Sequence, residues 1–318
     1  MIAQPSSLLR IIRASDPIPV EHPIFLIFGQ PGICKSSLGF SAEDPITLNF
    51  DGLNGLARTV NRRESIDIAS TDQFRELRNT PEFLDPFTTL VVDTVGRALD
   101  LMSEEVIEDT PKYGRNGSLT LQGYGDLKTR FRSWMSATRK LNKNILLLSH
   151  HKEDKDGDSV FVRPDIVGAS LGEVLKVADF VGFLYMAGKQ RMLDFNPTER
   201  WFGKNPAGWK PFVIPEPAKA RDFLAKLCDE GRAALGKISE VSATAAQTVM
   251  DWRIKIEALT TVEEFNRAAP EIRQLNATTQ PQVVKLIIDR SKAIGFAYDA
   301  QRKVFTAPQP AQENVMAL

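Results

Sequence analysis

Cysteine is scarce in this sequence, since the 318 residues include only Cys34 and Cys228. Two cysteines cannot form the disulfide framework of a small secreted protein, so a reducing compartment is expected. The absence of a signal peptide and of any 18-residue apolar run predicts a cytoplasmic protein without membrane contacts. The 40 Lys and Arg residues balance the 40 Asp and Glu residues, so any surface for nucleic acid has to be local.

The segment 24–38, IFLIFGQPGICKSSL, passes from an apolar strand through a Gly-rich turn into a helix. This is the context of a phosphate-binding P-loop. Lys35 is expected to place its charge on the β- and γ-phosphates and Ser36 to bind Mg²⁺, beside the positive end of the helix dipole. The expected nucleotide-binding residues are Gly29, Gln30, Pro31, Gly32, Ile33, Cys34, Lys35, Ser36 and Ser37.

One position departs from the pattern G-x-x-x-x-G-K-[ST], because Cys34 stands where the second Gly is expected. A Cβ there would crowd the β-phosphate or shift the loop. Three interpretations remain open at this point. The segment is an ATPase site, a site that binds ATP but hydrolyses it poorly, or an ordinary turn from a buried strand into a helix.

Polar residues follow the other expected strands. Asp93 comes after the apolar run 87–92, as a Mg²⁺-binding Walker B residue does. Asp51 follows the strand 46–50, where an acidic residue acts on Mg²⁺ or water, although an Asp-Gly turn explains it equally well. His150 or Ser149 ends the strand 144–148 in the place of a γ-phosphate sensor. The expected catalytic residues are Lys35, Asp51 and His150, and the expected metal ligands are Ser36 and Asp93.

Two further groups of residues are candidates for contacts outside the nucleotide. The segment 109–125 has four glycines and no clear period, which predicts a mobile loop. It is either a plain solvent loop or a DNA-binding loop that uses Lys112, Tyr113, Arg115 and Tyr124. Arg191, after an expected hairpin turn at 188–190, and Lys204 are either surface charges or residues acting on a neighbouring subunit's γ-phosphate.

Alternating strands and helices predict an α/β fold with a mostly parallel sheet and a small C-terminal helical domain. Helices are expected at 95–108, 127–141, 243–259, 262–269, 271–275 and 282–294. A charged loop is expected at 152–172, and Thr261 to Glu264 match a capping box. The expected organisation is a lead-in (1–22), an ATP-binding core (23–217), a linker or helix (218–242), a helical domain (243–306) and a disordered tail (307–318).

These motifs together resemble one family, the phage RecA-like P-loop ATPases of the Sak/RadA type, which are nucleotide-binding or single-strand annealing proteins. The resemblance covers residues 22–213 and is carried by Lys35-Ser36, Asp93, the Gly/Tyr segment, Leu148-Ser-His150 and Ala178-Asp179-Phe-Val-Gly182. It implies a RecA-like core, ATP and Mg²⁺, nucleotide sites at subunit interfaces of a ring or filament, and single-stranded DNA bound by segments 109–125 and 152–170. It also implies a host-cytoplasm location and a single-strand-binding protein as a partner.

The chain differs from this family at Cys34 and at Leu53, where the family's activating carboxylate is expected. The leading hypothesis is an ATP-hydrolysing recombination or single-strand annealing factor that binds DNA as an oligomer. The alternative is a nucleotide-binding assembly or regulatory protein with weak or no hydrolysis and no DNA binding. A small-molecule kinase ranks last, because no acceptor pocket or lid motif is evident.

Overall fold

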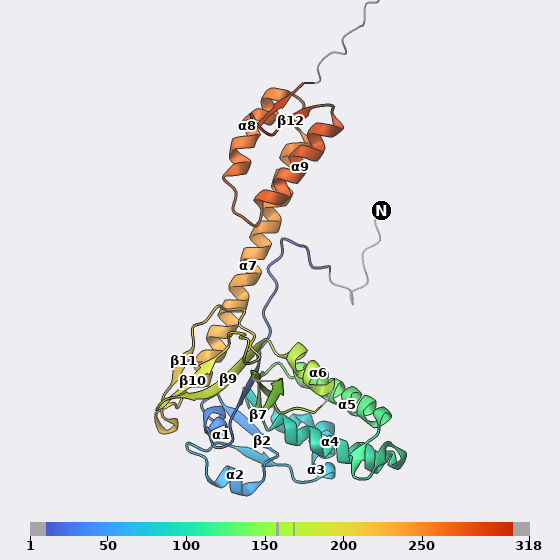
Figure 1. The fold of residues 1–318 in the computed structure, drawn as a ribbon, viewed down its shortest axis with the longest axis vertical. Helices are drawn as coiled ribbons and strands as arrows, with labels where there is room; N and C mark the ends of the chain where they lie inside the picture. Colours follow the sequence, from blue (N-terminus) through green and yellow to red (C-terminus); the bar gives the residue numbers. More distant parts are fainter. Residues whose placement is uncertain (1–10, 157–158, 168, 308–318) are drawn as a thin grey trace, which may run out of the picture. The chain divides into compact units, whose positions relative to one another are not determined.

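The structure is a computed structural model that describes residues 11–156, 159–167 and 169–307. The chain divides into two compact units, and Figure 1 shows the helices and strands of each. The core unit is Val20–Leu235, and the described residues of the second unit are 11–19 and 236–307. In these residues, no helix combines the length and the apolar character needed to cross a membrane.

The core unit is built on one sheet of nine strands. They are β1 (Ile24–Gly29), β2 (Pro45–Asn49), β3 (Ser65–Asp67), β4 (Thr89–Asp93), β7 (Asn144–Asp156), β8 (Ser159–Pro164), β9 (Phe180–Ala187), β10 (Gln190–Asp194) and β11 (Phe212–Ile214). The order is β11-β10-β9-β1-β7-β4-β2-β3, with β8 paired to β7. All pairs from β9 across to β3 are parallel, whereas β8, β10 and β11 pair antiparallel. The predicted α/β class with a mostly parallel sheet is confirmed.

Helices cover both faces of this sheet (Figure 1). They are α1 (Lys35–Gly39), α2 (Leu53–Ala57), α3 (Thr71–Asn79), α4 (Val95–Asp109), α5 (Leu121–Arg139), α6 (Ala169–Val177) and α7 (Phe223–Glu257). Along β1, Ile24, Leu26 and Phe28 lie in one apolar core, whereas Phe25 and Ile27 lie in the other. The first core includes residues of α3 to α6, and the second includes residues of α1 and the beginning of α7. This alternation is what a parallel strand buried on both faces requires.

The prediction of a mobile loop at 109–125 is wrong. α4 continues to Asp109, and a 3₁₀ turn and a small hairpin, β5 (Gly114–Arg115) and β6 (Ser118–Leu119), precede α5. α5 begins at Leu121, not 127, because the Thr120 hydroxyl accepts a hydrogen bond from the Gly123 N–H and caps the helix. A Cβ at position 123 would lie 2.8 Å from the Tyr113 carbonyl oxygen. The glycine therefore permits close packing rather than marking a loop.

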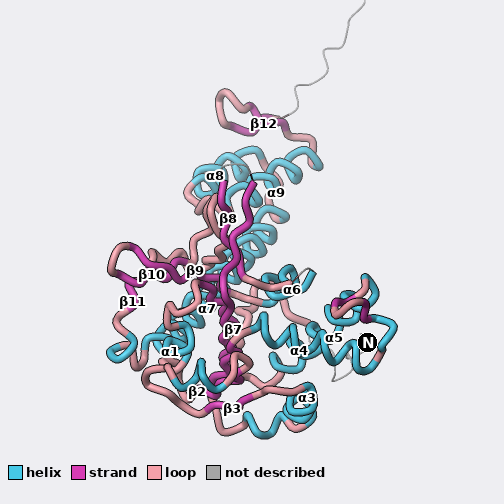
Figure 2. Tube along the Cα trace, turned by 60° about the horizontal axis from the view of Figure 1, so that its bottom comes forward, coloured by secondary structure: helices cyan, strands magenta, loops and turns pink. Residues whose placement is uncertain are grey.

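The charged loop expected at 152–172 is also mostly regular. β7 continues to Asp156 and pairs with β8, so the two strands form a long ribbon, visible in Figure 2. Residues 152–155 of β7 are exposed and charged, so composition alone suggested a loop. The hairpin turn predicted at 188–190 is confirmed, since Ala187 of β9 pairs with Gln190 of β10.

The second unit contains α8 (Val262–Arg273), α9 (Gln280–Ala293) and the hairpin β12 (Ala297–Asp299) and β13 (Val304–Thr306). Phe265, Val283 and Phe305 lie in its buried core. The predicted capping box is confirmed, because the Thr261 hydroxyl accepts from the Glu264 N–H and the Glu264 carboxylate accepts from the Thr261 N–H. α8 is one helix instead of the two predicted, since it continues through Pro270 despite the missing N–H.

The linker expected at 218–242 is largely helical. α7 begins at Phe223, and the boundary between the two units falls after Leu235, inside this helix. No proline interrupts the sequence from 223 to 257, so nothing in it stops the helix. Residues 1–10 of the predicted lead-in (1–22) and residues 308–318 of the predicted tail (307–318) lie outside the described residues.

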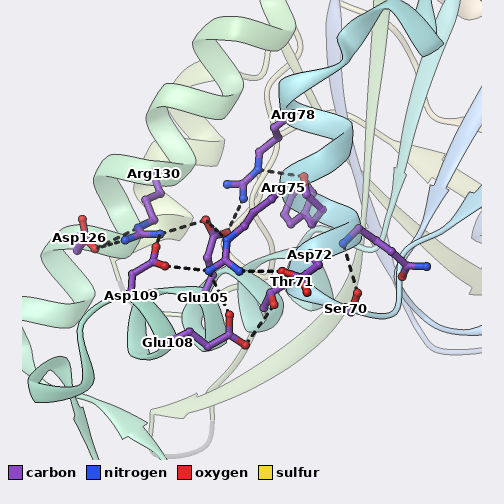
Figure 3. Close-up of polar contacts among 12 residues, drawn as sticks. Ser70, Thr71, Asp72, Arg75, Arg78, Glu105, Glu108, Asp109, Asp126 and Arg130 are labelled. Atoms are coloured by element: carbon purple, nitrogen blue, oxygen red, sulfur yellow. Dashed lines mark hydrogen bonds and ion pairs between the residues drawn. The ribbon is translucent and has the colours of Figure 1, made fainter.

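Three helices of the core unit are joined by ion pairs around Glu105 of α4 (Figure 3). The Glu105 side chain is only 7% exposed. It lies 3.1 Å from Arg130 of α5, 2.5 Å from Arg78 of α3 and 3.6 Å from Arg75 of α3. Arg75 and Arg130 also contact Asp109, at 2.9 and 2.6 Å. A carboxylate this well paired fixes how α3 and α5 pack against α4.

Glu105→Ala is expected to lower the free energy of unfolding by about 2 kcal/mol, because it removes the buried carboxylate that three partly buried guanidinium groups share. Urea unfolding followed by circular dichroism measures the change. Asp72→Ala is the matched control, since Asp72 pairs with Arg75 at 3.2 Å but its side chain is 90% exposed. The control should match the unmodified protein within error, and equal losses in both variants would contradict the role assigned to burial.

Candidate functional site

The P-loop joins β1 to α1 and surrounds the ammonium group of Lys35, which is only 5% exposed. The Lys35 Nζ donates to the carbonyl oxygens of Gly29, at 3.0 Å, and Gln30, at 2.9 Å. Glycine is required at position 29 because a Cβ would lie 2.3 Å from the Leu184 carbonyl oxygen of β9. The main chain of the loop thus holds a cation at the start of α1, where phosphate binds in such loops.

His150 connects Lys35 to Asp51. Its Nδ1 lies 3.3 Å from the Lys35 Nζ, and its Nε2 lies 3.4 Å from Asp51 Oδ2. A charged ammonium only donates, so Nδ1 accepts from Lys35 and Nε2 carries the proton that faces Asp51. The three residues predicted to be catalytic therefore lie in one continuous chain of polar contacts.

Asp51 is held in its ionised form. The hydrogen bond from His150 is the main cause that lowers the pKa of Asp51, and burial opposes it. The Thr94 hydroxyl, 3.3 Å from Asp51 Oδ1, and the Arg97 guanidinium, at 3.9 Å, lower this pKa further. The lowered pKa keeps this carboxylate ionised at neutral pH, so it can accept a hydrogen bond from a water, but it also makes the carboxylate a weaker base.

Ser36 and Asp93 meet at the same edge of the sheet. Asn49 of β2 is in register with Asp93 of β4, and Gly29 of β1 with His150 of β7, so the carboxyl ends of these strands converge. Asp93 is only 4% exposed, and burial raises its pKa, whereas the neighbouring Ser36 hydroxyl lowers it. A buried carboxylate beside a hydroxyl fits Mg²⁺, which prefers oxygen ligands.

The backbone explains the departure at Cys34. This residue has φ 70° and ψ 34°, the left-handed conformation that favours glycine and costs other residues about 1–2 kcal/mol. The Arg191 guanidinium of β10 contacts its thiol, with 3.8 Å between Nη2 and Sγ. Cys34 therefore occupies the glycine conformation of the P-loop pattern without converting the loop to another shape.

A cavity of about 710 Å³ contains most of these groups. Among the residues expected to bind nucleotide, those lining it are Pro31, Gly32, Cys34, Lys35, Ser36 and Ser37. Asp51, Asp93 and His150 line it as well. The sequence analysis missed Gly55, Arg58, Thr59 and Arg97, which complete the lining. Arg97 had a signal, since it follows Asp93 by four residues at the start of a helix, whereas Arg58 had none.

Other predicted residues lie elsewhere. Lys112, Tyr113 and Arg115 are in the turn and hairpin between α4 and α5, and Tyr124 is in α5, so none lines the nucleotide cavity.

The remaining predicted residues also lie outside this cavity. The Lys204 Nζ donates to the Ala178 carbonyl oxygen at 2.6 Å. Ile33 is buried in the second apolar core, and Leu53, at the start of α2, is 63% exposed. The Ser149 hydroxyl is buried and donates to the His150 carbonyl oxygen.

The family model described as AAA domain matches residues 21–207, more than half of the chain. The chain belongs to this family. The match begins before β1 and ends after β10, so the AAA domain contains the whole Lys35, Asp51, Asp93 and His150 site. This is a P-loop NTPase-type domain, for which nucleotide binding, usually with Mg²⁺, is the expected activity. None of the curated proteins matches the sequence.

Cys34→Gly is expected to raise the free energy of unfolding by about 1 kcal/mol, because it removes the left-handed strain and only part of that gain is offset by the greater unfolded-state entropy of glycine. Denaturant unfolding of the AAA domain protein measures the change. Cys34→Ala keeps a Cβ in the same conformation and serves as the control. Equal stability of the two variants would contradict the explanation from backbone strain.

The affinity of the AAA domain for ATP is expected to fall as pH rises through about 8. Burial lowers the pKa of Lys35 to about 8, so the free site loses its ammonium above this pH, and ATP binding there should take up a proton. Calorimetry at pH 8.5 in two buffers of different ionisation enthalpy measures this uptake. Lys35→Arg, whose guanidinium stays charged, should show none, and proton uptake in both proteins would assign it to another group.

Proposed function

We propose that this chain is a Mg²⁺-dependent ATPase of the phage Sak/RadA type that acts in DNA recombination or single-strand annealing. The observation that carries the ATPase proposal is the chain of contacts from Lys35 through His150 to Asp51, beside the Ser36 and Asp93 pair. It combines a phosphate-binding cation, a proton acceptor and two metal ligands in one cavity.

In the proposed reaction, Lys35 and the N–H groups of the loop bind the β- and γ-phosphates. Asp51, which is ionised, orients the attacking water and accepts its proton as the bond to phosphorus forms. His150 positions Asp51 and, through Nδ1, responds to any movement of the Lys35 ammonium towards phosphate. Mg²⁺, held by Ser36 and Asp93, would neutralise charge on the phosphates.

The proposed assembly is a ring or filament that binds single-stranded DNA, with a single-strand-binding protein as a further partner. Lys112, Tyr113, Arg115 and Tyr124 remain the proposed DNA contacts. Arg191 and Lys204 remain proposed to act on a neighbour's nucleotide. Because Arg191 contacts Cys34 and Lys204 donates to Ala178 within one chain, this role requires both side chains to exchange those partners on assembly.

The second candidate is a nucleotide-binding assembly or regulatory protein that hydrolyses ATP weakly and binds no DNA. Leu53 favours it, since the exposed position expected to hold an activating carboxylate holds an apolar residue. The strained conformation of Cys34 also favours it, because a Cβ is present where ATPases of this type have none.

The two candidates are separated by ATP hydrolysis with Mg²⁺, measured with and without single-stranded DNA. Asp51→Asn should lower the rate at least 100-fold while ATP binding persists, because the amide cannot accept the proton. Lys35→Ala should lose binding as well. Asp229→Asn is the matched control, since its side chain is 66% exposed and lies outside the nucleotide cavity.

DNA-stimulated hydrolysis that Asp51→Asn abolishes would support the recombination ATPase. Binding of ATP without hydrolysis in the unmodified protein would support the assembly protein. Full hydrolysis by Asp51→Asn would overturn the assignment of Asp51 as the proton acceptor.

A further inference from the structure

A second cleft of the core unit, of about 350 Å³, is lined by Phe40, Asn61, Arg62, Arg63 and Arg221. The three arginines are exposed, and none of them forms an ion pair with another described residue. Elsewhere in the core, arginines such as Arg75 and Arg130 are paired with carboxylates. Nothing in the function proposed above uses this cleft.

The cleft shares a wall with the nucleotide cavity. Arg58 and Thr59 line the nucleotide cavity, and residues 61–63 of the same segment line the cleft. Between them, the Val60 N–H donates to the Ser37 hydroxyl at 3.0 Å, which fixes this segment against the P-loop helix. The Asn61 side-chain N–H donates to the Pro217 carbonyl oxygen at 2.8 Å, which ties the cleft residues 61–63 to the segment that leads to Arg221.

α1 runs from the phosphate-binding residues towards the cleft. Lys35 and Ser36, which would hold the β- and γ-phosphates and Mg²⁺, begin this helix, and Phe40, which lines the cleft, follows its last residue. Five helical residues span about 7.5 Å. The cleft thus lies within reach of the nucleoside of a nucleotide whose phosphates bind at Lys35 and Ser36.

We propose that this cleft binds the base and ribose of the nucleotide whose phosphates bind the P-loop. The inference rests on the proposed ATP binding and adds the residues that recognise the nucleoside. Guanidinium planes stack on aromatic rings, so Arg62 and Arg221 provide the stacking surfaces. Because the Asn61 N–H is engaged by Pro217, its Oδ1 is the acceptor for an exocyclic amino group such as that of adenine.

The test uses calorimetry with the full chain in the presence of Mg²⁺ and compares two ligands. They are ATP and inorganic tripolyphosphate, which has no nucleoside. Arg62→Ala and Arg221→Ala should each weaken ATP binding about tenfold, the loss expected for one stacking contact, and leave tripolyphosphate binding unchanged. Arg200→Ala is the matched control, since Arg200 is exposed and lines neither cavity. Asn61→Ala should reduce the preference for ATP over UTP, which lacks the amino group.

Equal weakening of ATP and tripolyphosphate would overturn the proposal, because the cleft would then act on phosphate charge. Unchanged ATP affinity in Arg62→Ala and Arg221→Ala would overturn it as well. If the unmodified protein binds neither ligand, the P-loop assignment itself fails. If instead the unmodified protein binds both ligands and the cleft variants bind them with the same affinities, only the cleft proposal fails.

Discussion

The buried ammonium of Lys35 is the constraint on which the rest of the site depends. A charge removed from water needs compensating partners, and the loop supplies two carbonyl oxygens while His150 supplies a third acceptor. Each partner occupies a set place in the sheet, because Gly29 and His150 are in register on neighbouring strands. Two other strands of the sheet, β2 and β4, bring Asp51 and Asp93 close enough that both favour the charged form of Lys35. The site therefore depends on the order of the strands in the sheet as well as on the P-loop.

Much of this was predictable from the sequence. Each strand of the parallel sheet is a short apolar run, and a polar residue at its end marks the edge where ligands bind. The positions of Asp51, Asp93 and His150 follow from that rule, and the position of Lys35 follows from the P-loop pattern. The contacts among these side chains could not be predicted, because sequence spacing indicates which residues lie at an edge of the sheet but not which side chains are in contact. Arg58 belongs to the cavity only because the chain after α2 turns back towards Ser37.

The two wrong predictions of loops, at 109–125 and 152–172, have the same kind of physical cause. Glycine at 123 was taken as a loop signal, although it permits contact between α5 and the Tyr113 main chain. The run of charges after His151 was taken as a loop, although these exposed residues belong to β7 and pair with β8. In both cases, local composition was overridden by a tertiary contact that only the folded chain reveals.

α4 connects the sheet edge at Asp93 to the ion pairs around Glu105. The helix begins two residues after Asp93 and ends at Asp109, within the ion pairs around Glu105. Its 15 residues form a stiff rod about 22 Å long. Glu105 and Asp109, the carboxylate partners of the guanidinium groups of α3 and α5, are side chains of this helix. A shift of α4 along its axis would therefore move these ion pairs together with the residues that follow Asp93.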